Sequence, residues 1–389
     1  MMNDGRLALY LHIPFCRHRC SYCDFNTYTS LGDLKVSYTD ALCREIEQVG
    51  RLAGGERPCH TIFFGGGTPS LMSPAMLGQI LQSVRRHFAL TDDVEITMEA
   101  NPGTVDGAYL TAVRQLGINR ISFGVQSAIA SELVLLEREH DFPAVIAAMA
   151  DVRAAGFNNF SLDLIYGVPG QTLESWEESL RAALTLEPPH ISLYCLTIEP
   201  GTPMNRWLGN GRIQPPDPDL AADQYELASQ ILADHGLIQY EISNWARPGH
   251  ECRHNLVYWR NQEYLGLGAG AHGSANGYRY EVVKQPRVYI RRMANEAVGP
   301  FPLSAAVAAH HAVDRAEAMS DTIITQLRLL QEGLDLAAFQ TRFGQSLDDA
   351  FDGTMSQLVD WGLLAVGNGR LRLTQQGRFL SNQVFYRFM

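Results

Sequence analysis

The sequence predicts an α/β protein in which a parallel sheet curls into a partial (β/α)6 TIM-like barrel, followed by a smaller, mostly helical domain. Between residues 7 and 200, short apolar runs alternate with segments that have helical spacing of apolar residues. Strands separated by helices favour parallel pairing, and a right-handed crossover at each step bends such a sheet toward a barrel. Beyond residue 300 the alternation gives way to helical segments and one short hairpin.

The predicted barrel strands are apolar runs that end at glycine, proline or polar residues, as buried strands do. We expect them at 7–13, 60–64, 94–100, 120–125, 159–165 and 190–196. The helices between and after them have apolar residues at i, i+3 and i+4, and we expect these at 36–51, 74–88, 105–116, 142–155, 173–184 and 219–235. Chemistry in such barrels lies at the C-terminal ends of the strands.

Proline and glycine pairs interrupt the pattern after residue 200, and they suggest three parts. We expect a barrel at 1–210, a connecting region at 211–300 and a winged-helix-like domain at 301–389. In the last part, helices are expected at 317–331, 336–343 and 347–361, then a hairpin around Gly367-Asn368-Gly369 and a final helix from Gln375. Residues 319–389 hold six Arg, no Lys and seven Asp or Glu, which disfavours DNA binding.

The composition excludes several classes of protein. A net charge of −11 gives no attraction to nucleic acid or to an anionic membrane. No apolar stretch reaches the roughly 18 residues of a membrane span, and we expect no signal peptide. Seven cysteines, three of them within eight residues, fit a reducing compartment and a metal site. We therefore expect a cytoplasmic protein.

Three cysteines follow the first predicted strand directly. Cys16, Cys20 and Cys23 have the spacing C-x3-C-x2-C. A [4Fe–4S] cluster normally takes four ligands, so three thiolates leave one iron open to another molecule. A structural zinc site with His18 as the fourth ligand is the alternative.

The cysteine motif, with the aromatic Tyr22 before its third cysteine, resembles that of the radical S-adenosylmethionine (SAM) superfamily. The resemblance implies a [4Fe–4S] cluster on the three cysteines, SAM on the fourth iron, and reductive cleavage of SAM to a 5′-deoxyadenosyl radical. Gly65-Gly66-Gly67-Thr68-Pro69 is similar to the GGE-like element that holds the SAM amino group. By itself, such a run is more often a tight turn.

Further matches at strand ends are similar to the oxygen-independent coproporphyrinogen III oxidase-like branch of that superfamily. They imply a set of SAM-contacting residues, which are Tyr10, Tyr22, Gly66, Gly67, Thr68, Glu99, Gln126, Arg138 and Asp163. In the oxidase, the positions of Gln126, Arg138 and Asp163 serve a second SAM molecule. The oxidase also has a fourth cysteine two residues after the third, where this chain has Phe25.

Residues 254–259, with the sequence HNLVYW, are similar to the HNxxYW motif of the HemW-type haem chaperones. The resemblance implies that His254 is an axial ligand of haem iron and that Tyr258 and Trp259 offer flat faces to a porphyrin. Arg253 and Arg260 could pair with propionates. The alternative is a histidine that is hydrogen-bonded among core aromatic residues.

Other histidines and cysteines lie near this motif or within the predicted barrel elements. His250, Cys252 and His272 are further ligand candidates, although the glycines before His272 suggest a buried turn. Cys43, Cys59 and Cys195 fall within or beside predicted elements, and we interpret them as ordinary buried cysteines.

The sequence therefore predicts a radical SAM-fold protein that binds a [4Fe–4S] cluster, SAM and haem, and transfers haem to apoproteins such as respiratory enzymes. It would need a reductant for the cluster, it could make transient contact with membrane-bound partners, and it would bind no nucleic acid. Three alternatives stay open: a coproporphyrinogen III oxidase, another radical SAM enzyme that methylates a substrate or degrades haem, and a winged-helix regulator with the cluster as sensor.

Overall fold

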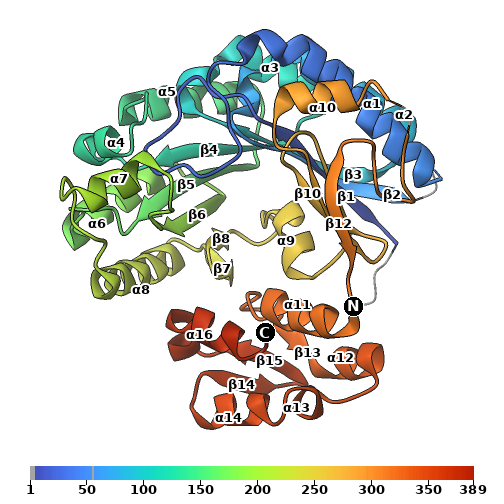
Figure 1. Ribbon diagram of the computed structural model, residues 1–389. Coiled ribbons are helices and arrows are strands. Elements are labelled where there is room, and N and C mark those ends of the chain that lie inside the picture. Colours follow the sequence, from blue (N-terminus) through green and yellow to red (C-terminus); the bar gives the residue numbers. More distant parts are fainter. Residues whose placement is uncertain (1–4, 55–56, 296) are drawn as a thin grey trace.

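The computed structural model describes residues 5–54, 57–295 and 297–389. Residues 1–4, part of the segment in which we expect no signal peptide, lie outside the described residues. The predicted fold class is confirmed: a parallel sheet with helices on its outer face is followed by a smaller C-terminal domain (Figure 1). No helix in the described part of the chain is long and apolar enough to cross a membrane.

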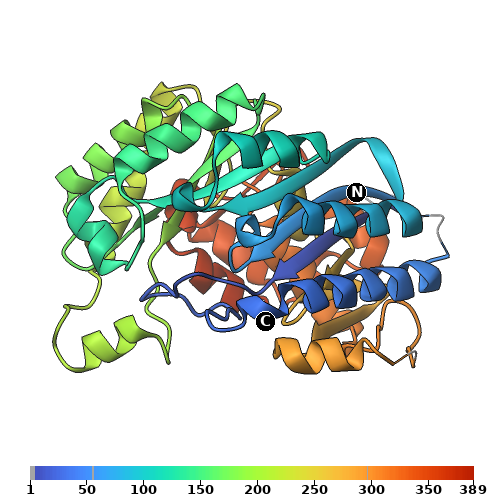
Figure 2. The same ribbon diagram turned by 90° about the horizontal axis from the view of Figure 1, so that it is seen from above.

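The centre of the sheet is parallel and follows chain order. Its strands are β1 (Leu7–Ile13), β2 (Pro58–Gly66), β3 (Ala89–Ala100), β4 (Arg120–Gln126), β5 (Phe160–Tyr166) and β6 (His190–Cys195). The helices that follow them are α1 (Lys35–Leu52), α2 (Pro74–His87), α3 (Gly107–Gln115), α4 (Ala130–Leu135), α5 (Phe142–Ala154), α6 (Leu173–Leu184), α7 (Pro203–Gly209) and α8 (Pro218–Asp234). Figure 2 shows most of these helices nearest the viewer, with the strands beneath them.

Residues 211–312 add strands to both edges of this sheet, so the last of these strands lies in the part expected to belong to the C-terminal domain. On one edge, β8 (Asn244–Ala246) and β7 (Ile238–Glu241) continue from β6 in antiparallel pairing. On the other, β9 (Tyr264–Leu267) runs parallel to β1, and β10 (His272–Ala275), β11 (Tyr278–Val282) and β12 (Val307–Ala312) follow it antiparallel. The two edges remain apart in the strand order, so the barrel is open.

Two helices belong to the same region. The short helix α9 (Arg253–Trp259) lies inside the curve of the sheet, and α10 (Pro286–Arg292) packs on α1 (Figure 1). Short 3-10 turns at Gly32–Leu34, Pro69–Leu71 and Pro102–Thr104 follow strand ends and the cysteine loop.

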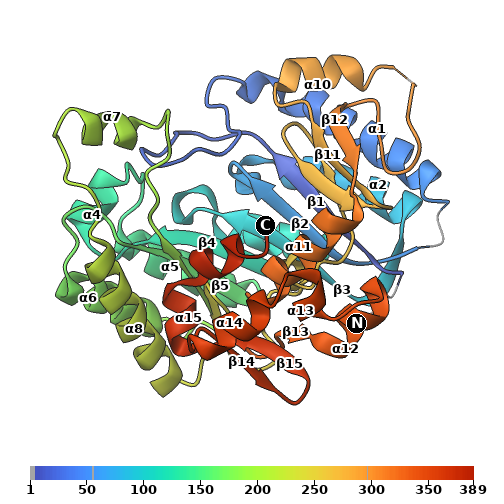
Figure 3. The same cartoon turned by 60° about the horizontal axis from the view of Figure 1, so that its bottom comes forward.

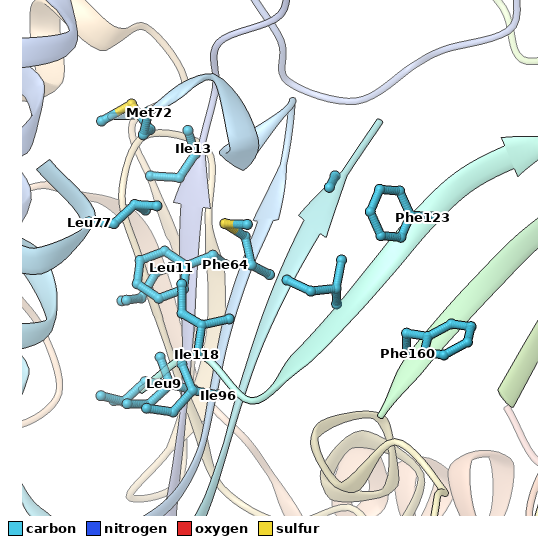
Figure 4. Packing of buried hydrophobic residues seen from close by; sticks show 14 of the residues in the cluster. Leu9, Leu11, Ile13, Phe64, Met72, Leu77, Ile96, Ile118, Phe123 and Phe160 are labelled. Atoms are coloured by element: carbon cyan, nitrogen blue, oxygen red, sulfur yellow. The ribbon is translucent and has the colours of Figure 1, made fainter. Parts of the chain in front are cut away.

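The main core lies between the sheet and its outer helices. Leu9, Leu11 and Ile13 of β1 are fully buried, and they pack with Phe64 of β2 and Leu77 of α2 (Figure 4). Helix starts are set locally, because the side chains of Ser73, Asp141 and Thr172 accept hydrogen bonds from the first turns of α2, α5 and α6. This rigid layer fixes the strand ends at which the site lies.

The C-terminal domain has its own core and a three-stranded sheet ordered β13-β15-β14. Its elements are α11 (Arg315–Gln326), β13 (Leu334–Asp335), α12 (Leu336–Phe343), α13 (Leu347–Ala350), α14 (Thr354–Asp360), β14 (Leu364–Gly367), β15 (Arg370–Leu373), α15 (Gln375–Phe379) and α16 (Ser381–Tyr386). The order of helix, strand, helices and hairpin agrees with the winged-helix-like arrangement. Figure 3 shows this domain against the open side of the barrel.

Two helix predictions in this domain are wrong. The helix expected at 347–361 is split, because Asp352 and Gly353 have φ values of 49° and 78° and reverse the chain between α13 and α14. The helix expected at 317–331 ends at Gln326. The following residues instead reach the barrel, where the Leu330 backbone N–H donates to the Tyr240 carbonyl.

Candidate functional site

The three motif cysteines lie on the loop that follows β1. Backbone hydrogen bonds tie the ends of this loop together, from Tyr28 N–H to Pro14 and from Cys16 N–H to Tyr28. The Ser21 hydroxyl donates to the Leu135 carbonyl at 2.8 Å, which fixes the middle of the loop to α4. The loop is therefore held over the C-terminal ends of the strands, as expected.

The cysteine loop covers a cavity of about 410 Å³. Its lining includes every predicted cluster residue and most of the predicted SAM residues, which are Cys16, Cys20, Tyr22, Cys23, Gly66, Gly67, Thr68, Glu99, Gln126, Arg138 and Asp163. Tyr10 is the exception, because it lines two neighbouring cavities instead. The structure thus brings together residues from five strand ends that are far apart in the sequence.

Burial affects the protonation of two of the three motif thiols. Burial is the main cause that raises the pKa of Cys16 and of Cys23, so these thiols stay neutral until a cation replaces the proton. Thr68 Oγ1 lies 3.6 Å from Cys16 Sγ, and Arg138 donates to Cys20 Sγ at 3.4 Å. Both contacts would stabilise negative charge on sulfur.

The three motif cysteines do not form a site for a single metal ion. In the described part of the chain, no three His, Cys, Asp or Glu side chains are placed to share one metal ion. A cluster makes no such demand, because each thiolate binds a different iron. His18, the proposed fourth ligand of the zinc alternative, lies 3.6 Å from Glu137.

The glycine run after β2 is packed tightly against the cysteine loop. A Cβ atom on Gly66, whose φ is 110°, would lie 2.4 Å from the His12 ring, and one on Gly67 would lie 2.7 Å from the Phe15 carbonyl oxygen. The backbone N–H groups of Gly67 and Thr68 donate to Ile13 and Phe15. Because these donors are already used, the run can offer a bound molecule acceptors rather than donors.

Two acidic residues lie deep in the cavity. The Glu99 carboxylate accepts the Gly66 N–H at 3.0 Å, and burial together with nearby Asp163 raises the pKa of Glu99 to about 7. Asp163 accepts hydrogen bonds from Ser122 and Ser161 at 2.9 and 3.0 Å, and burial raises its pKa as well. Glu99 lines three adjoining cavities, so it lies at the centre of the whole site.

Arg138 connects the cysteine loop to the strand ends. It donates to the Gly124 carbonyl at 2.8 Å and to Asn101 Oδ1, in addition to Cys20. Gln126 ends β4 with a φ of 68°, which for a residue other than glycine is a strained conformation that turns the chain at the cavity wall. Asn101, which sequence reasoning missed, also donates to Thr68 Oγ1 at 3.2 Å; its signal was the Asn101-Pro102 pair at a strand end.

The HNLVYW segment forms α9, and its histidine is buried. The Glu95 carboxylate accepts the N–H groups of Arg253 and His254 at 3.2 and 3.1 Å and so caps the helix. His254 is 1% exposed; its Nδ1 pairs with Thr61 Oγ1 at 2.9 Å and its Nε2 with Tyr258 Oη at 2.8 Å. Burial lowers the pKa of His254 to about 3, so the ring is neutral.

The residues around His254 are arranged differently from the sequence-based interpretation. Arg260 forms an ion pair with Glu332, and Arg253 pairs with Asp93, and neither residue lines the cysteine cavity or the cavities that adjoin it. Trp259 stacks under Arg328, whose guanidinium lies 4.3 Å from the ring centre. Tyr258 and Trp259 both line a cavity of about 780 Å³ next to the cysteine cavity.

One further expectation about a single residue is wrong, and another is confirmed only in part. Cys195 is exposed rather than buried, because it ends β6 and lines the cysteine cavity. His272 is exposed and lines the 780 Å³ cavity, although the glycines before it do form a turn that is mostly buried. Cys59 and Cys252 are buried and Cys43 is half-buried.

Comparisons with known proteins agree with this geometry. Residues 10–183 match the family model of the radical SAM superfamily, and residues 313–380 match the HemN C-terminal domain. The protein named heme chaperone HemW from Bacillus subtilis is 37% identical over 384 residues, which cover 98% of this chain and 99% of that protein. The protein of the same name from Mycobacterium tuberculosis is 38% identical over 389 residues, covering 98% and 95%.

A solved structure shows the same fold. Coproporphyrinogen III oxidase (HemN) from Escherichia coli, a radical SAM enzyme, superimposes with a TM-score of 0.84 at 24% identity, covering 100% of this chain and 91% of that one. The fold and the three-cysteine loop thus define a radical SAM protein with a HemN-type C-terminal domain. Within that class, the full-length similarity shows that the chain belongs to the HemW family.

Proposed function

We propose that the protein is a haem chaperone of radical SAM fold that binds a [4Fe–4S] cluster, SAM and haem, and passes haem to apoproteins such as respiratory enzymes. The observation that carries the proposal is the cavity where Cys16, Cys20 and Cys23 face Glu99 and Arg138. Relatives named heme chaperones across their full length support the chaperone role. Seven free thiols support a reducing, cytoplasmic setting.

The residues of the cavity suit a cluster and a SAM molecule. When bound, the cluster supplies an electron that can cleave SAM reductively. Cys16, Cys20 and Cys23 would hold three irons, while Arg138 and Thr68 donate toward two of the sulfurs. An ammonium group needs hydrogen-bond acceptors, which the carbonyl groups of the glycine run and the Glu99 carboxylate can supply.

Phe25 separates this proposal from the oxidase alternative. It is 64% exposed, and it lines both the cysteine cavity and the 780 Å³ cavity. The resemblance implies a cysteine at this position in the true oxidase, and a phenylalanine side chain offers no sulfur to a metal or a radical. We therefore propose that the chain is not a coproporphyrinogen III oxidase.

Anaerobic reconstitution of the full chain with iron and sulfide, followed by ferric haem titration with and without SAM, tests the proposal. We expect one haem per chain, and transfer to the apo form of a b-type respiratory cytochrome that is faster than haem release into buffer. Equal rates with and without the acceptor would contradict the chaperone role.

The oxidase alternative needs its own assay. The reconstituted protein is incubated anaerobically with coproporphyrinogen III, SAM and dithionite, and the porphyrins are separated after oxidation. We expect no protoporphyrin to accumulate, and a Phe25→Cys variant serves as the matched comparison. Steady turnover to protoporphyrinogen IX by the unmodified chain would overturn the proposal.

A further inference from the structure

A second cavity, of about 780 Å³, adjoins the cysteine cavity. The cysteine loop, α9 and strands β9–β11 contribute to its lining, and the two cavities share Arg19, Asp24, Phe25, Thr27, Gly66 and Glu99. Its volume lies in the range of about 300–1,000 Å³ that is typical of sites for cofactors. A ligand in one cavity would therefore touch the wall of the other.

The second cavity combines aromatic side chains with free positive charge. Tyr258, Trp259 and Tyr264 line it, and the rings of the two tyrosines meet edge to face at 4.6 Å. Arg279 is already paired with Asp321. Among the described residues, the Arg19 and Lys284 side chains have no carboxylate partner, and Arg19 donates only to the backbone carbonyls of Cys23 and Phe25.

Three histidines lie in or beside this cavity, and their ring nitrogens differ. His12 uses both, pairing with Tyr10 Oη at 3.1 Å and with the Asn26 carbonyl at 3.0 Å. His254 also uses both and lines the smaller cavity of about 190 Å³. The His272 ring is exposed and forms no hydrogen bond within the part of the chain that the structure describes.

The strand geometry explains why His272 points into the cavity. Along β10, Gly273 and Ala275 are buried, whereas His272 and Ser274 lie on the opposite face and both line the cavity. The opposite face of β10 has no room for a side chain, because a Cβ on Gly273 would lie 2.2 Å from the Tyr280 ring.

We propose that the 780 Å³ cavity is the haem site and that His272, rather than His254, supplies the axial imidazole, with Arg19 and Lys284 as the cations for the propionates. The inference rests on the proposed haem-chaperone function and assigns its ligand. A neutral imidazole with a free nitrogen is what haem iron requires. His254 could meet that requirement only by giving up one of the two hydrogen bonds that its buried ring forms.

The test is a titration of ferric haem into the full chain after cluster reconstitution, followed by the Soret band and by electron paramagnetic resonance. We compare His272→Ala with His254→Gln, which keeps hydrogen-bonding groups at the buried position. His310→Ala is the matched control, because His310 is an exposed histidine on β12 that does not line the cavity. We expect the Kd to rise at least about tenfold for His272→Ala alone.

Two further measurements make the result specific to the iron ligand. Added imidazole should restore the low-spin spectrum of His272→Ala, and His272→Met should bind haem with an altered spectrum and a higher reduction potential. If the unmodified chain binds no haem, the proposed function fails. If it binds haem and His272→Ala keeps the same affinity and spectrum, the function stands and the assignment of His272 is overturned.

Discussion

Replacing Glu99 by Gln should stabilise the cluster-free protein at alkaline pH, although it removes a residue from the centre of the site. Burial and Asp163 raise the pKa of Glu99 to about 7 in the folded chain from an ordinary value of 4.5. The native state therefore binds more protons than the unfolded state between these values, and stability falls as the pH rises through that window. The glutamine side chain of the Glu99→Gln variant would not titrate, and its amide oxygen could still accept the Gly66 N–H.

The size of the effect follows from the pKa values. A change from 4.5 to about 7 corresponds to about 3.4 kcal/mol at 1.36 kcal/mol per pKa unit. The Glu99 side chain is only half-buried, so solvent in the cavity screens part of this, and we expect about 1–2 kcal/mol. Below pH 5 the carboxyl is protonated in the fold, and the difference between Glu99→Gln and the unmodified chain should be near zero.

Urea unfolding of both proteins at pH 5 and pH 8 measures the difference in the free energy of unfolding. Glu178→Gln is the control, because it removes the same charge from the exposed face of α6, away from the cavity. Its free energy of unfolding should differ from that of the unmodified chain by the same amount at pH 5 and at pH 8. A Glu99→Gln variant that is less stable than the unmodified chain at pH 8 would refute the reasoning. A difference that does not change with pH would also do so.

Three other predictions concern the glycine run, the buried His254 and the cysteine loop. Gly66→Ala should lower the free energy of unfolding in urea by about 2–4 kcal/mol, because φ is 110° and the new methyl group would meet the His12 ring. Gly103→Ala is the control and should change stability little, because the space around Gly103 is open. Equal losses for the two variants would contradict this account. Thr61→Val should lower the free energy of unfolding by about 1–3 kcal/mol, because it leaves His254 Nδ1 unpaired. Thr61→Ser keeps the hydroxyl and should retain most of the stability. A Thr61→Val variant as stable as the unmodified chain would argue against the hydrogen bond. Cys20→Ser should lower the iron bound on reconstitution and abolish the cluster signal in electron paramagnetic resonance, while Cys43→Ser on α1 should keep both; intact iron binding by Cys20→Ser would exclude it as a ligand.

Local sequence rules predict the barrel strands and helices well where one signal dominates. The strand at 7–13 is an apolar run that is buried on both faces. The helix at 173–184 begins at the reciprocal cap formed by Thr172 and Ser175. For each of these two elements, the predicted first and last residues agree with the structure. The edge strands β7–β12 are short and partly polar. Their pairing is decided by long-range contacts, such as that of β9 with β1, which no local pattern encodes.

The same limit applies to the site. Strand ends of a parallel sheet meet at one edge, so the sequence could group the cysteines with Glu99, Arg138 and Asp163, and the structure places them around one cavity. It could not show that Cys195 faces this cavity, since a cysteine at the end of an apolar strand is more often buried. The Cys195 side chain is exposed because the cavity at the strand ends lies beside it, and that cavity forms only when the whole barrel has folded.

The contrast between His254 and His272 shows what a motif can and cannot identify. The i, i+4 spacing of His254 and Tyr258 places both side chains on one face of α9, where they hydrogen-bond to each other and to Thr61. A histidine with both nitrogens satisfied in the core contributes stability, but it offers no lone pair to a ligand. His272 lies in no recognisable pattern, yet the alternation of β10 and the bulk of Tyr280 behind Gly273 direct it into an aromatic cavity. The HNLVYW segment therefore shapes the wall of that cavity through Tyr258 and Trp259, while a side chain from a different strand provides the free nitrogen.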